Sequence, residues 1–88
     1  MLQRTNFTVM TKFKVKEKIW EVKWVENGKS LLLVIPNSSV LYLCRGKDME
    51  DEFTLTVRDL MLKEGLTMEE CSARVNWLKS QITLFGFS

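Results

Sequence analysis

The 88-residue sequence contains no histidine, two cysteines and a single proline. Without histidine there is no imidazole metal ligand, no histidine-based catalytic triad and no side chain that ordinarily titrates near neutral pH. The cysteines, Cys44 and Cys71, are too few for a disulfide framework or a four-ligand zinc site, so we expect both to be reduced and buried. No nucleophile has a recognisable base beside it, and a core of this size encloses no deep pocket. We therefore expect no metal, no cofactor, no small-molecule substrate and no enzymatic activity.

Long apolar runs are also absent. The longest, residues 31–36, has six residues, whereas a helix that crosses a bilayer needs roughly 20. Residues 1–6 lack the apolar core of a secretory signal. We expect an intracellular protein, in the cytoplasm or the nucleus, with no membrane partner.

The length and composition, with 45% hydrophobic and 27% charged residues, are typical of one globular domain over residues 1–88. The net charge of +2 is unevenly distributed along the chain. Residues 1–47 carry nine Lys and Arg against three Asp and Glu, whereas residues 48–88 carry four against eight. This division predicts a polarised surface, which suits head-to-tail or reciprocal contact between copies of the chain.

Alternating apolar and polar residues predict four antiparallel strands in the first half of the chain. The alternation changes phase around Lys16-Glu17-Lys18, which indicates a tight turn, and Asn27-Gly28 is typical of a type I′ hairpin turn. The third strand is almost wholly apolar, as expected for a strand covered on both faces or with one face awaiting a partner. We expect the strands at residues 7–15, 19–25, 30–35 and 39–45.

Helices are predicted in the second half. Residues 46–52 break the apolar pattern and predict a solvated loop, while residues 53–57 fit either a fifth strand or the start of a helix. We favour an extended chain to about Leu55 and then a short helix that ends before Gly65. The next helix has the clearest pattern, because Thr67 and Glu70 form a capping box. Its apolar stripe consists of Met68, Cys71, Val75, Leu78 and Ile82.

These elements predict an α+β fold: a four-stranded, or with residues 53–57 five-stranded, antiparallel meander, then a short helix and a longer C-terminal amphipathic helix. We expect the longer helix to pack on one face of the sheet and to end at Gly86, leaving an apolar tail. One helix covers too little area for all the apolar residues present, including Leu41 and Leu43. Either the tail and the short helix cover the rest in a compact monomer, or the surplus is buried against a second copy or a different protein.

The surplus apolar surface predicts a small non-enzymatic interaction module of the adaptor or inhibitor type. Its partner would be another protein or a second copy in a homodimer, bound through the uncovered sheet face and the tail. The predicted interface residues are Leu84, Phe85, Phe87, Met10, Ile19 and Val25.

An alternative is a single-stranded nucleic-acid-binding protein, which would combine basic strands with tryptophans that stack on bases. Against it, lysines on an edge strand also prevent aggregation, and the alternation around Trp20 and Trp24 favours tryptophans inside the core. The residues of this alternative are Lys12, Lys14, Lys16, Lys18, Lys23, Trp20 and Trp24.

Overall fold

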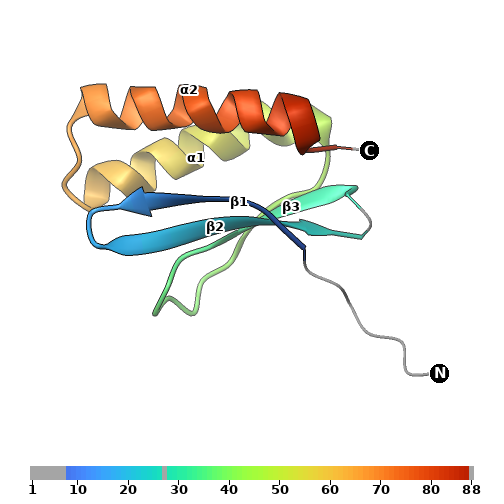
Figure 1. The fold of residues 1–88 in the computed structure, drawn as a ribbon, viewed down its shortest axis with the longest axis horizontal. Coiled ribbons are helices and arrows are strands. Elements are labelled where there is room, and N and C mark those ends of the chain that lie inside the picture. The colour runs from blue at the N-terminus through green and yellow to red at the C-terminus, as the bar shows by residue number, and fades with distance from the viewer. Residues whose placement is uncertain (1–7, 27, 88) are drawn as a thin grey trace.

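The computed structural model describes residues 8–26 and 28–87, so the predictions for residues 1–7 and for Asn27 lie outside the described residues. It confirms the α+β fold: four antiparallel strands in the order β1-β2-β3-β4 are followed by two helices. Both helices lie on the same side of the sheet (Figure 1). The elements are β1 (Thr8–Val15), β2 (Lys18–Val25), β3 (Ser30–Val34), β4 (Tyr42–Cys44), the 3-10 turn η1 (Lys47–Met49), α1 (Glu50–Lys63) and α2 (Met68–Phe85).

The turn between β1 and β2 is the tight turn that the change of phase predicts. Val15 pairs with Lys18, so the two residues between them form the whole turn, with Lys16 at φ 58. A two-residue turn of this kind matches the twist of the strands that it joins. The alternation therefore changes phase because the chain reverses, and the same side of the sheet receives Thr11, Phe13 and Val15 of β1 and the even residues of β2.

The second hairpin is also present, with Gly28 at φ 86 in the turn between β2 and β3. The fourth strand is shorter than the predicted range 39–45. Before it, the Ser38 amide donates to the Ile35 carbonyl at 3.2 Å and the Ser38 hydroxyl accepts from the Val40 amide at 3.2 Å. This local bonding takes up backbone groups that pairing with β3 would have used, so the strand begins at Tyr42.

The prediction for residues 46–57 is wrong, because α1 begins at Glu50 and has neither a preceding long loop nor an extended segment to Leu55. Three acidic residues, Glu50 to Glu52, occupy the first turn, where the helix dipole favours negative charge. Behind them, Phe53, Val57 and Met61 recur at four-residue spacing and are buried. The acidic cluster marks the start of a helix. The predicted stop at Gly65 is confirmed, with that residue at φ 99 just past the helix.

The capping box of α2 is confirmed. The Glu70 amide donates to Thr67 Oγ1 at 3.1 Å, and the Thr67 amide donates to Glu70 Oε1 at 3.0 Å. The buried residues of α2 are those of the predicted stripe, except that Met68 is exposed. The helix reaches Phe85, so Leu84 and Phe85 belong to its last turn and do not form a tail.

The core lies between the sheet and the two helices. Fully buried side chains of the sheet, among them Trp20, meet buried side chains of α1 and α2. Cys44 and Cys71 are reduced and buried within this core, as predicted. The largest fully buried side chains are Trp20, Leu31, Leu33, Met61 and Leu78.

Candidate functional site

The side of the sheet opposite the helices carries no covering helix or strand among the described residues (Figure 1). We call it the open face. The register places Lys12 opposite Glu21, and Leu32 between Lys23 and Leu43. Because side chains alternate along each strand, the residues of this face are those that point away from the core. The open face includes Val9, Lys12, Lys14, Ile19, Glu21, Lys23, Val25, Leu32, Val34 and Leu43.

The open face divides into a charged half and an apolar half. On the charged half, formed by β1 and most of β2, Lys23 Nζ lies 3.6 Å from Glu21 Oε1. On the other half, Leu43 is 38% exposed and pairs with Leu32. Ile19, which is 47% exposed, lies diagonally across from Val34 on this face. We call Ile19, Leu32, Val34 and Leu43 the apolar patch.

The predicted interface residues of the sheet do not come together. Ile19 lies in the apolar patch. Val25 lies on the open face but is half-buried, opposite the buried Ser30. Met10 lies at an irregularity in β1 and packs against the core. Only Ile19 therefore contributes to an exposed apolar cluster.

The three C-terminal residues are also separated. Leu84 is 68% exposed and Phe85 is exposed beside it, whereas Phe87 is half-buried and packs against the core. The chain end is held by the Trp24 indole, whose Nε1 donates to the Gly86 carbonyl at 2.7 Å. A Cβ at Gly86 would collide with the carbonyl of Ile82, so glycine allows the close approach at this point.

The two tryptophans of the nucleic-acid alternative are buried to different degrees. Trp20 is completely buried, and its ring lies 6.0 Å from that of Phe13. Trp24 is half-buried, with its indole N–H bonded to Gly86. The core positions favoured by the alternation are thus confirmed for Trp20.

The five lysines of that alternative differ in their surroundings. Lys12 and Lys14 are exposed on β1, and Lys16 is exposed in the turn that follows. The other two have carboxylates nearby: Lys18 Nζ lies 3.6 Å from Glu64 Oε1, and Lys23 Nζ lies 3.6 Å from Glu21. The continuous basic surface is therefore limited to β1 and its turn.

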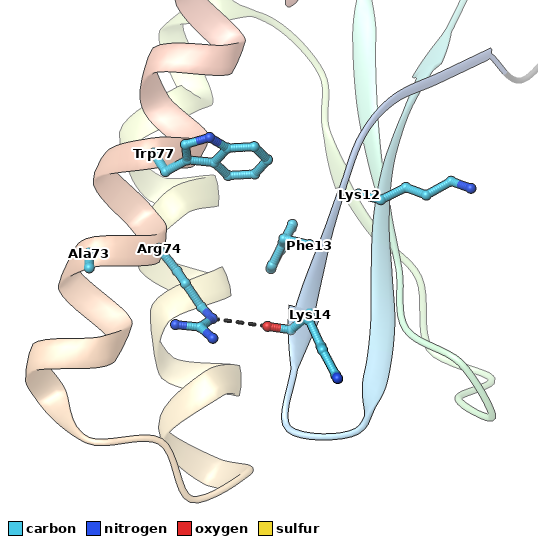
Figure 2. A pocket seen from close by; sticks show the side chains of 6 residues that line it. All are labelled: Lys12, Phe13, Lys14, Ala73, Arg74 and Trp77. Atoms are coloured by element: carbon cyan, nitrogen blue, oxygen red, sulfur yellow. Dashed lines mark hydrogen bonds between the residues drawn. The ribbon is translucent and has the colours of Figure 1, made fainter.

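A groove between β1 and α2 is the feature that the sequence reasoning missed (Figure 2). Its volume is about 320 Å³, and the rings of Phe13 and Trp77, which line it, contact each other edge to face with centroids 6.2 Å apart. The Arg74 guanidinium spans the gap, with Nε donating to the Lys14 carbonyl at 2.9 Å. Trp77 lies outside the buried stripe of α2, and an aromatic residue in that position was the available signal. The lining residues are Lys12, Phe13, Lys14, Ala73, Arg74 and Trp77.

The two thiols have environments that suppress their reactivity. Burial raises the pKa of the Cys44 thiol, and the acidic Glu50 and Asp48 nearby act in the same direction. Burial likewise raises the pKa of Cys71, with a further contribution from Glu70. Both sulfurs are therefore protonated at neutral pH, and a protonated thiol is a weak nucleophile and a weak metal ligand.

Comparisons of the chain with protein-family models, with curated proteins and with solved structures found no match. Neither helix of the described chain has the length and apolar character needed to cross a bilayer. Within residues 8–26 and 28–87, no three His, Cys, Asp or Glu side chains are grouped so as to hold a metal ion.

Proposed function

We propose that the chain is a small non-enzymatic protein-binding module and that a second copy covers its apolar patch. The observation that carries this proposal is the patch itself, in which four aliphatic side chains from three strands lie on a sheet face that neither helix covers. Removing such side chains from water stabilises a contact by about 25 cal/mol per Å².

A second copy suits this patch because the patch is apolar and therefore complementary to itself. In a two-fold dimer the same patch is contributed by both chains, and this is the commonest symmetry of soluble oligomers. Lys14 of β1 is paired with Ile19 at the border of the patch, whereas Lys12 lies opposite Glu21. Two patches therefore meet best through Leu32, Val34 and Leu43, which lie on the strands away from β1. The module would act as an adaptor or an inhibitor, and its two reduced thiols support an intracellular location.

Sedimentation equilibrium over a range of concentrations tests this proposal. We expect the wild type to dimerise and Leu43→Lys to weaken the dimer about tenfold or more, which corresponds to about 1.4 kcal/mol. The matched control is Leu55→Lys, because Leu55 is also an exposed leucine but lies on α1. A wild type that stays monomeric at high concentration would overturn the proposal, as would an equal effect of the two variants.

The nucleic-acid alternative retains support from the three exposed lysines Lys12, Lys14 and Lys16. It loses Trp20 as a stacking surface, because that side chain is buried, and Trp77 is the exposed tryptophan beside these lysines. Titration with a fluorescent single-stranded oligonucleotide at two salt concentrations separates the two functions, since counterion release makes nucleic-acid binding steeply salt-dependent. Tight, salt-sensitive binding would favour the alternative, and we expect none.

A further inference from the structure

The outer edge of β1 presents backbone groups to which another strand can bind. β1 pairs with β2, and no described strand lies on its other side. The two-residue turn makes Val15 and Lys18 a hydrogen-bonded pair, so by alternation the N–H and C=O groups of Lys14 and Lys12 point away from β2. The hydrogen bond from Arg74 to the Lys14 carbonyl lies on this outer side, which agrees with that assignment, and an added strand would share or replace this bond.

The groove lies directly beside this edge. Phe13 points from β1 towards α2, and Trp77 points from α2 towards β1, while the Lys12 side chain leaves β1 on the opposite side (Figure 2). Trp77 is 40% exposed, so a side chain inserted beside it gains apolar contact. A strand added at the β1 edge would direct the residue opposite Phe13 into this groove, and its neighbours on either side onto the open face.

The charges at this edge select the partner. Lys12 and Lys14 are exposed on the open face, Arg74 stands on the groove side, and no acidic residue lines the groove. Glu21 of β2 lies directly opposite Lys12, and its carboxylate forms an ion pair with Lys23. Opposite charges on facing strand positions are favourable and like charges are not, so acidic residues are preferred opposite the two lysines.

We propose that the β1–α2 groove binds an extended peptide segment in which an apolar residue lies between two acidic residues, and that this segment adds a fifth strand to the sheet. The apolar residue packs against Phe13 and Trp77, and the acidic residues lie beside Lys12 and Lys14. The inference rests on the proposed role as a protein-binding module, but it uses a different surface from the apolar patch. The lysines that discourage indiscriminate pairing at this edge thus also set its specificity.

Fluorescence anisotropy with a labelled heptapeptide of alternating glutamate and valine tests the charge requirement. We expect salt-sensitive binding, at least tenfold weakening in Lys12→Glu/Lys14→Glu, and gain of binding by that variant to the matching lysine–valine peptide. The control Lys29→Glu/Lys63→Glu makes the same change of charge at two exposed lysines that do not line the groove, and should bind as the wild type does. Equal weakening in both double variants would overturn the proposal, because it would reflect net charge alone.

A proline at residue 12 tests the added strand. Lys12→Pro removes an N–H that points away from β2, so it should be tolerated in this edge strand. It should lose peptide binding at least fivefold relative to Lys12→Ala, which removes the same charge but keeps the N–H. Equal binding by the two variants would overturn strand addition, and thermal unfolding of both identifies any loss due to misfolding.

Two substitutions of Trp77 test the apolar contact in the groove. We expect Trp77→Ala to weaken peptide binding and Trp77→Phe to keep most of it.

Further measurements separate the peptide-binding proposal from self-association through the apolar patch and from nucleic-acid binding. Peptide binding should persist in Leu43→Lys, and its loss there would overturn the independence of the groove from the apolar patch. A wild type that dimerises but does not bind the peptide overturns the groove proposal alone, whereas a monomer that binds the peptide overturns self-association alone. Displacement of the peptide by a single-stranded oligonucleotide at equal concentration would assign the groove to nucleic acid and overturn the peptide.

Discussion

The covered face and the open face of the sheet are made from alternate residues of the same strands, and β3 shows how differently the two are treated. Leu31 and Leu33 point towards the helices and have no exposed surface, whereas Leu32 and Val34 point the other way and are half-buried. All four are aliphatic, so hydrophobicity does not distinguish them. The difference arises from register, because α1 and α2 pack on one side and the other side holds the lysines and the apolar patch. Apolar character in a strand therefore marks two kinds of surface, one for folding and one available for binding.

The largest expected effect comes from substituting neighbouring leucines on the two faces. Leu33→Ala should cost about 2–5 kcal/mol of unfolding free energy, because it leaves a cavity in a packed core. Leu32→Ala should cost about 1 kcal/mol or less, since its side chain is already partly in contact with water. Urea unfolding at low protein concentration measures both. Equal losses would show that the open face is packed as tightly as the covered face.

A smaller loss of unfolding free energy should follow from removing the N-terminal cap of α2, one of the two helices on the covered face. Thr67→Ala removes the hydroxyl that accepts from the Glu70 amide, and loss of such a cap costs about 1 kcal/mol. Thr83→Ala is the matched control in the same helix, because the Thr83 hydroxyl donates back to the Lys79 carbonyl and caps nothing. Hydrogen exchange should speed up in the first turn of α2 for the first variant and not for the second. Similar unfolding free energies for the two variants would contradict this account.

The smallest expected effect is a pH dependence at the same helix start. Hydrogen bonds from the Thr67 backbone and side chain lower the pKa of Glu70 below its ordinary value. A carboxyl whose pKa is lower in the folded state stabilises the fold at neutral pH, and this contribution is lost as the pH falls through the ordinary range of glutamate towards the folded-state pKa. Glu70→Gln should therefore flatten the acid side of the stability profile. Glu69→Gln, in the same first turn, should flatten it less, and an equal change in both would contradict the role of the cap.

Much of the architecture followed from short-range patterns. The phase change around Lys16 and Glu17 marked a hairpin because side-chain alternation has a period of two and a reversal of the chain shifts it. The capping box at Thr67 and Glu70 marked a helix start because both partners lie within four residues. The start of α1 was missed because Glu50 to Glu52 have the composition of a solvated loop. Their place in a helix depends on burial of Phe53 and Val57 against the sheet, which is a contact distant in sequence.

The candidate surfaces were predicted less completely than the fold. Ile19 was expected on an exposed apolar face and lies there, but Met10 and Phe87 pack against the core. The sequence did not predict a role for Trp77. The helical periodicity shows that Trp77 lies outside the buried stripe of α2, but it does not show which residue lies opposite. Its position across from Phe13 depends on how far α2 lies from the edge of the sheet, which no local pattern encodes.

By itself, the sequence determined the elements that depend on neighbours in the chain: the meander, the capped helix, the reduced cysteines and the division of charge between the two halves. These depend on turn geometry, capping and composition, which act over a few residues. The tertiary structure alone decided which strand face is covered and how the lysines of β1 come to flank an aromatic groove. Both depend on the packing of α1 and α2, and packing joins residues as distant as Lys14 and Arg74 through contacts that no short segment contains.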